Sequence, residues 1–183
     1  MKITAFVGSP NQNGNSTALA QAMCDAAARH GHETRLIHLY KMKIAGCMDC
    51  GACKTSSDKC VIADDFQSCW QELITSDGII LASPVYFGQV TGVLKTFLDR
   101  WCCFFSPGFA VRQLSGKKFA TVTTCGAPAE RFRSVTDYLN YWMSDFFKMK
   151  LVGNVMGGDL VKHSQATQRS ELLEAAAKIG ASF

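Results

Sequence analysis

Short apolar runs alternate with amphipathic segments along the whole chain of 183 residues. The apolar runs predict five β-strands, at 2–7, 34–39, 78–82, 119–124 and 151–156. Apolar residues at helical spacing predict helices at 17–30, 64–76, 91–101, 134–148 and 164–179. Strands that alternate with helices are typical of an α/β fold, in which helices cover both faces of a parallel sheet.

The length fits one domain, residues 1–183, with one long insertion loop at about 41–63. In parallel α/β sheets, ligands bind beyond the carboxyl ends of the strands. Three loops of unusual composition leave those ends, at 8–17, 83–91 and 124–130. We therefore expect the binding site at this edge of the sheet.

The first of these loops, GSPNQNGNST, joins a strand to a helix and is rich in hydrogen-bonding side chains, at Ser9, Asn11, Asn13, Asn15, Ser16 and Thr17. Gly14 allows close backbone approach, and free N–H groups at a helix start favour a phosphate. Because the loop lacks a Walker sequence, a dinucleotide fingerprint and any basic residue, we expect a phosphate monoester held by hydrogen bonds. The alternative is a polar turn in which Ser16 caps the helix.

The second loop, SPVYFGQV, follows the continuously apolar strand GIILA. Pro84 and Gly88 restrict its backbone, and Tyr86 and Phe87 place two aromatic rings at the edge of the sheet. A planar heterocycle could lie against such a loop, with backbone groups contacting its edge. The alternative is that the two rings serve only in packing.

Charge and hydropathy exclude several classes of protein. The net charge is +4, and the basic residues are scattered, so nothing supports nucleic acid binding. No run of about 20 residues is apolar enough to span a membrane. The first strand is too short for a signal-peptide core, so we expect a cytoplasmic protein, where structural disulfides are uncommon.

Four of the nine cysteines fall within CMDCGACKTSSDKC, spaced C-x2-C-x2-C-x6-C, at Cys47, Cys50, Cys53 and Cys60. A reducing compartment disfavours disulfides, and zinc sites more often use two separated pairs. Short x2 spacings are closer to the ligation of an iron–sulfur cubane. A [4Fe–4S] cluster, free or redox-active thiols, and zinc remain as alternatives. Because this loop follows the second strand, we expect it near the binding edge.

The remaining candidates have structural interpretations. Cys24 and Cys69 lie on predicted helices and are expected in the core. The segment 101–105, WCCFF, and the aromatic helix 138–147 predict either a subunit interface or core packing. Asp99 and Arg100 end a helix, where a structural ion pair or cap is expected.

GSPNQNGNST, SPVYFGQVTGVLKTFLDR and the cysteine loop, in this order and at these separations, resemble the flavodoxin-like NAD(P)H-dependent FMN reductase superfamily, and most closely its iron–sulfur flavoprotein branch. The resemblance covers roughly 1–160. It implies a three-layer sandwich with a five-stranded parallel sheet in the order 2-1-3-4-5, and FMN where that order reverses.

The resemblance also assigns residues. Matches to the phosphate loop are Ser9, Asn15, Ser16 and Thr17, and matches to the ring-binding loop are Pro84, Val85, Tyr86, Phe87 and Gly88. A third loop would approach the ring from the other side through Thr124, Cys125 and Gly126. Cys125 and Pro128 depart from the glycine-rich version that is common among relatives.

The resemblance implies an FMN-dependent oxidoreductase whose chemistry is carried by FMN rather than by catalytic side chains. NAD(P)H, acting transiently, or a ferredoxin-type protein is the expected donor, and a small molecule or protein the acceptor. A [4Fe–4S] cluster would exchange electrons with FMN, and relatives are usually homodimers or homotetramers. The alternatives are a plain NAD(P)H:quinone or FMN reductase without a cluster, a flavodoxin-like electron carrier, and a zinc-stabilised binding module.

Overall fold

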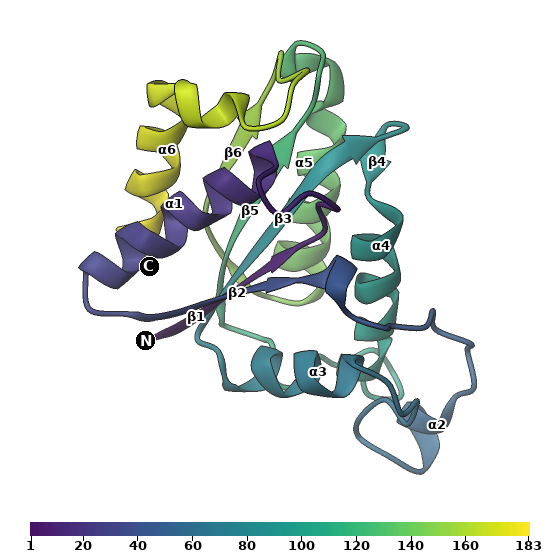
Figure 1. Cartoon of the computed structure of the whole chain (residues 1–183). Coiled ribbons are helices and arrows are strands. Elements are labelled where there is room, and N and C mark those ends of the chain that lie inside the picture. The colour runs from purple at the N-terminus through teal and green to yellow at the C-terminus, as the bar shows by residue number, and fades with distance from the viewer.

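A computed structural model describes all 183 residues and shows a parallel sheet between two layers of helices (Figure 1). The five long strands pair in the order β2-β1-β3-β5-β6. Their bounds are β1 Lys2–Val7, β2 Glu33–His38, β3 Gly78–Tyr86, β5 Lys118–Thr124 and β6 Lys150–Gly157. The expected order 2-1-3-4-5 is therefore confirmed for these strands. A sixth, two-residue strand, β4 (Gln89–Val90), pairs antiparallel with the end of β3.

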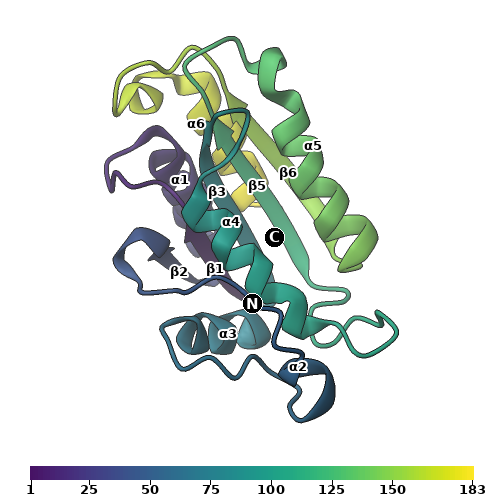
Figure 2. The same cartoon turned by 90° about the vertical axis from the view of Figure 1, so that its right-hand side faces the viewer.

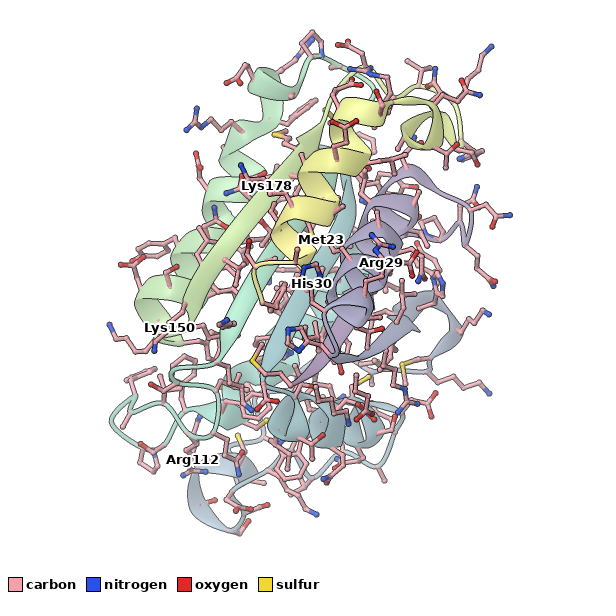
Figure 3. The ribbon with its side chains drawn as sticks, turned by 90° about the vertical axis from the view of Figure 1, so that its left-hand side faces the viewer. Met23, Arg29, His30, Arg112, Lys150 and Lys178 are labelled. Carbon is pink, nitrogen blue, oxygen red and sulfur yellow. The ribbon has the colours of Figure 1, made fainter.

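Two groups of helices cover the two faces of the sheet. One face carries α1 (Asn15–Arg29) and α6 (Ser170–Gly180), as Figure 3 shows. The other face carries α3 (Phe66–Thr75), α4 (Gly92–Asp99) and α5 (Arg133–Tyr141), which lie in front of the sheet in Figure 2. The other helical turns are short: η1 Leu39–Lys41, α2 Ala52–Thr55, η2 Arg100–Phe104, η3 Ala129–Phe132, η4 Trp142–Phe146 (a π-turn) and η5 Gln165–Gln168. No helix has both the length and the apolar character that crossing a membrane requires.

Each face of the sheet has its own hydrophobic core. Successive side chains of a strand point to opposite faces, so Ile3, Ala5 and Val7 pack toward α1 and α6, whereas Phe6 joins the core beneath α3 and α4. Cys24 and Cys69 are buried, as expected of core residues.

The α1–α6 layer packs so closely that one position accepts only glycine. A Cβ atom at Gly180 would lie 2.1 Å from the carbonyl oxygen of Met23 on α1. The chain then ends on Phe183, whose ring covers Gly78 at the start of β3. The C-terminal end of α6 is therefore fixed near the amino edge of the sheet.

Two predicted boundaries differ from the structure for identifiable reasons. The loop after GIILA begins as strand, because β3 continues to Tyr86 and folds back onto β4. The last helix starts at Ser170 rather than at 164, because Ser164 adopts a left-handed conformation (φ 61°) that an α-helix cannot contain.

Two aromatic residues of the segment 101–105 lie in the core of the chain itself. The sequence had allowed either core packing or a subunit interface for this segment. Trp101 and Phe104 are fully buried, and Trp101 meets Phe97 and Phe147 edge to face. An interface role is therefore wrong for these two side chains. Their burial places η2, directly after α4, firmly against the core.

Candidate functional site

The three predicted binding loops meet at one cavity beyond the carboxyl ends of β1, β3 and β5. A fourth segment, which follows β6, completes it. The lining residues are Ser9, Pro10, Asn11, Gly14, Asn15, Ser16, Pro84, Val85, Tyr86, Thr124, Cys125, Gly126, Leu160, Val161, Lys162 and His163. Four predicted site residues do not line it: Asn13, Thr17, Phe87 and Gly88.

The first loop folds tightly around the backbone of Asn11. Ser9 Oγ and Thr17 Oγ1 both donate to the carbonyl oxygen of Asn11, each at 3.1 Å. A Cβ atom at Gly14 would lie 2.8 Å from Ser9 Oγ, so glycine is required for this packing. The side chain of Thr17 is thus used within the loop, which explains why it does not face the cavity.

The hydroxyl of Ser16 is a buried group at this site that has no hydrogen-bond partner. Helix α1 starts at Asn15 after Gly14, and no side chain caps it, so the alternative of Ser16 as a helix cap is wrong. Ser16 lies in the first turn, is 1% exposed, and its buried Oγ has no hydrogen-bond partner. A buried hydroxyl without a partner costs free energy, and the N–H groups of a helix start attract anions. These residues therefore fit a bound phosphate.

Asn15 has a different task from the one the sequence predicts. Its Nδ2 donates to the carbonyl oxygen of Lys162 at 3.0 Å, and its Oδ1 accepts from the N–H of Ala166 at 2.9 Å. Ser164 Oγ adds a hydrogen bond to the carbonyl oxygen of Asn13 at 2.7 Å. Asn15 thus fastens the segment after β6 to the first loop. No motif marks that segment, so nothing in the sequence indicates its place at the cavity.

The second loop is held rigidly against the first. Thr91 caps α4, where its Oγ1 accepts from the N–H of Leu94 at 3.3 Å. The same hydroxyl donates to the carbonyl oxygen of Gly8 at 2.8 Å. Beyond this anchor, Tyr86 is half exposed at the cavity, whereas Phe87 at the hairpin tip is fully exposed. Phe87 and Gly88 have positive φ angles that form this tight turn.

The third loop, from Thr124 to Gly126, lines the cavity on the β5 side. The Cys125 thiol is buried and donates to the carbonyl oxygen of Ala127 at 3.1 Å. Burial raises the pKa of Cys125, so the thiol is protonated at neutral pH. The Cys125 thiol therefore serves in the packing of this loop.

The cysteine loop lies at the opposite end of α4 from this cavity. In Figure 1, α2 within the cysteine loop lies at the lower right, and β4 beside the binding edge lies at the upper right. Between them runs α4, whose eight residues span about 12 Å. The expectation that this loop lies near the binding edge is therefore wrong. The chain leaves β2 at the carboxyl edge but then runs back to the end of α4.

Six thiols surround one pocket at this far end. The four motif cysteines, Cys47, Cys50, Cys53 and Cys60, line it together with Cys102 and Cys103. No group of three or more His, Cys, Asp or Glu side chains is arranged to hold a metal ion. Burial raises the pKa of Cys103 to about 12 and also raises that of Cys53. The structure thus gathers the predicted ligands without assembling a coordination site, and it adds two thiols that the sequence pattern did not indicate.

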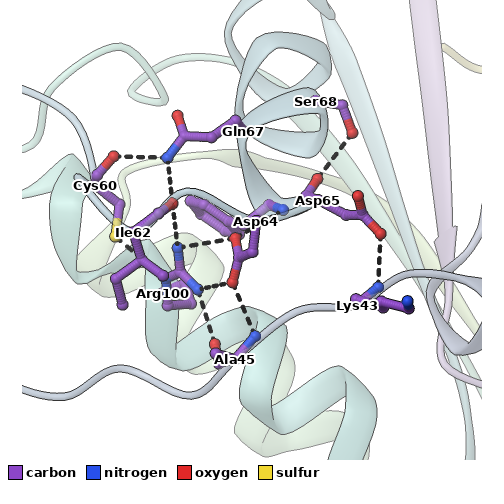
Figure 4. A network of polar contacts seen from close by, with 10 residues as sticks. Lys43, Ala45, Cys60, Ile62, Asp64, Asp65, Gln67, Ser68 and Arg100 are labelled. Carbon is purple, nitrogen blue, oxygen red and sulfur yellow. Dashed lines mark hydrogen bonds and ion pairs between the residues drawn. The ribbon is translucent and has the colours of Figure 1, made fainter.

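A buried guanidinium fixes the cysteine loop to α4 (Figure 4). The Arg100 side chain is fully buried and donates to both carboxylate oxygens of Asp64, at 2.7 and 3.2 Å. It also donates to the carbonyl oxygen of Ala45 at 2.8 Å and to Cys60 Sγ at 3.2 Å. Its plane lies over the ring of Phe66. The expected structural ion pair is confirmed for Arg100, whereas Asp99 pairs with Lys95 on the same helix.

Asp64 is ionised in this network. Burial by itself would raise the pKa of Asp64, but hydrogen bonds from Arg100 and from the backbone N–H groups of Ala45 and Phe66 outweigh it. The pKa of Asp64 therefore lies below its usual value. The ion pair consequently persists throughout the neutral pH range.

The sheet order and the cavity at its reversal point define a flavodoxin-like, mononucleotide-binding protein. The chain belongs to the NADPH-dependent FMN reductase family, whose model matches residues 1–159. The class expected from the loop motifs is confirmed: the chain is an FMN-dependent oxidoreductase.

Curated relatives carry the name iron–sulfur flavoprotein. The protein of that name from Methanosarcina thermophila is 31% identical over 141 residues, which are 76% of this chain and 73% of the relative. Iron-sulfur flavoprotein MJ1083 from Methanocaldococcus jannaschii is 41% identical over 100 residues, 55% of this chain and only 51% of the relative. Among solved structures, the NAD(P)H:quinone oxidoreductase from Methanothermobacter marburgensis superposes with a TM-score of 0.74 at 15% identity, over 99% of this chain and 96% of that one, which shows the shared fold.

The replacement Arg100→Met tests the buried network. We expect the free energy of unfolding to fall by about 3–5 kcal/mol, because Asp64 stays buried without its partner. Urea denaturation measures this loss. As a matched control, Lys95→Met removes a cation from the exposed pair on the same helix and should cost less than about 1 kcal/mol. Equal losses in the two variants would contradict the importance of the buried pair.

Proposed function

We propose that this chain binds FMN in the cavity at the carboxyl edge and uses it to pass electrons from NAD(P)H to a small-molecule or protein acceptor. The observation that carries the proposal is the buried, unpartnered hydroxyl of Ser16 at the start of α1. It lies at a cavity formed by the same loops that the family motifs indicate. When bound, FMN supplies the ability to accept a hydride and to release electrons singly or in pairs.

The residues of the cavity have separate tasks in this proposal. Ser16 and the N–H groups of the first turn of α1 donate to the phosphate. Ser9 lines the same wall, and its hydroxyl holds the first loop in shape by donating to the carbonyl oxygen of Asn11. Pro84, Val85 and Tyr86 hold the ring from the β3 side, and the loop from Thr124 to Gly126 holds it from the β5 side. Thr91 keeps the first two loops in register.

We further propose that the cysteine pocket holds a [4Fe–4S] cluster on Cys47, Cys50, Cys53 and Cys60. Four thiolates are the donor set that such clusters use, and all four line one pocket. Lys54 lines the same pocket, and its charge would offset part of the thiolate charge. Arg100, whose charge is paired with Asp64, already donates a hydrogen bond to Cys60 Sγ. The names of the curated relatives support this choice. Binding must draw the thiols closer together, since the protein alone does not assemble them.

The two sites lie at opposite ends of α4, so we propose that electrons pass between FMN and cluster across a homodimer or homotetramer interface. Two copies that pack their α4 faces antiparallel would bring the cysteine pocket of one to the FMN cavity of the other. A groove on this face supports such packing. It is lined mainly by apolar and aromatic side chains, including Leu98, Phe105, Phe109, Tyr138, Trp142 and Phe147, and Phe109 is 79% exposed.

Reduction of the purified protein tests the oxidoreductase. Protein isolated anaerobically and supplied with FMN should show flavin absorption bands that NADPH or NADH bleaches, because a hydride donor can approach the cavity beside the half-exposed Tyr86. Failure to take up FMN would refute the proposal. Bleaching by reduced ferredoxin but by neither nicotinamide would instead favour the flavodoxin-like carrier.

The variant Cys50→Ser tests the cluster. We expect it to lose iron and sulfide while it keeps FMN, because the two sites lie at opposite ends of α4. Elemental analysis and flavin absorption measure the two contents. Cys102→Ser is the matched control, since it removes an exposed thiol from the same pocket but outside the motif, and should keep the iron. Zinc without sulfide, or no metal in the wild type, would exclude the cluster.

The variant Phe109→Asp tests the interface. A charge on this exposed ring position should dissociate the oligomer, because it would be buried without a partner in the groove. Sedimentation velocity measures the change in mass. Tyr40→Asp places the same charge on another exposed aromatic, outside the groove, and should leave assembly intact. A monomeric wild type would rule out electron transfer between copies.

A further inference from the structure

The FMN cavity contains one lysine, Lys162, and no other residue with a fixed charge. Lys162 lies in the segment after β6, which no motif indicated. Of the sixteen residues that line the cavity, none is acidic, and the basic ones are Lys162 and His163. Both follow β6 and lie outside the loop motifs that indicated the site. The first loop itself has no lysine or arginine, so a phosphate bound there would otherwise meet only neutral donors.

The backbone of Lys162 is fixed on both sides. Its carbonyl oxygen accepts from Asn15 Nδ2 at 3.0 Å, and its N–H donates to Gln165 Oε1. Ser164 and Ala166 add the two contacts to Asn13 and Asn15 described above. The segment 160–166 is thus fastened directly onto the loop that carries Ser16. A side chain at position 162 therefore starts from a defined place at the wall of the cavity.

The charge of Lys162 has no partner within the chain. The Lys162 side chain is exposed, and none of the seven ion pairs includes it. A lysine whose backbone is held in place while its cation stays unpaired beside an anion-binding helix start suits an anionic ligand. A phosphate monoester carries a charge of about −1.5 to −2 at neutral pH, which one ammonium group partly neutralises.

We propose that Lys162 is the cation of the flavin phosphate site, and that it makes the chain select FMN over riboflavin, which lacks the phosphate. The proposal rests on the FMN site proposed above. The segment 160–166 acts as a clamp: Asn15 and Ser164 fasten it, and Lys162 contributes its charge to the phosphate that Ser16 and the start of α1 bind. His163 is the second basic group at this wall.

Titration of the flavin-free protein with FMN and with riboflavin, followed by quenching of flavin fluorescence, tests the selection. Lys162→Gln should weaken FMN binding about tenfold, the effect of losing one charge-assisted contact, and change riboflavin binding less than about twofold. Lys162→Arg, which keeps the charge, should retain most of the preference for FMN. Lys178→Gln is the matched control, because Lys178 is exposed near the far end of α6 (Figure 3).

Comparing FMN with riboflavin distinguishes failure of the role proposed for Lys162 from failure of the proposed FMN site. If wild-type protein prefers FMN and Lys162→Gln keeps that preference, or if the variant loses FMN and riboflavin to the same degree, Lys162 does not serve the phosphate. If the wild type binds neither flavin, the proposed FMN site fails and this inference with it. Added salt should also weaken FMN binding more in the wild type than in Lys162→Gln, because salt screens the charge pair.

Discussion

All five long strands run parallel, and this shared direction decides where the loops and cavities of the chain can lie. Each strand that ends at the carboxyl edge must be followed by a segment that returns to the amino edge. The turns that start these returns gather at one edge, and the order β2-β1-β3-β5-β6 opens a crevice between the turns after β1 and β3. The ends of the returning helices gather at the opposite edge. The cavity at the carboxyl edge and the cysteine pocket lie far apart because of this division.

The position of the cysteine pocket depends on the contacts of one buried side chain, Arg100. The loop after β2 begins at the binding edge, but Arg100 at the far end of α4 holds it through Asp64 and Ala45. Because the guanidinium is fully buried, its donors need partners, and the loop supplies them. The proposed flavin site and the thiol pocket therefore lie at opposite ends of α4 and have no lining residue in common. This separation is the reason for proposing that electrons pass between copies of the chain.

The cavity at the carboxyl edge, where we propose that FMN binds, combines segments that lie far apart in the sequence. The first loop gives neutral donors and a helix start, and the segment after β6 gives a cation. Asn15 connects the two segments. The sequence suggests that Asn15 binds phosphate, but in the structure its side chain positions the loop that carries Lys162. A substitution in either segment should therefore alter the position of the other.

Hydrophobic periodicity and turn residues are local signals, and they were enough to predict the alternation of strands and helices and the loops that meet at the cavity. The sheet order followed only from the resemblance of the loop motifs to a known family. Ser16 and the four motif cysteines were also visible in this way. Three features became apparent only in the folded chain: the cysteine loop lies at the far end of α4, Cys102 and Cys103 join its pocket, and Lys162 lines the cavity at the carboxyl edge. These outcomes depend on contacts between distant segments, such as those of Arg100 with Asp64 and of Asn15 with Lys162, and no local pattern encodes which buried donor meets which acceptor.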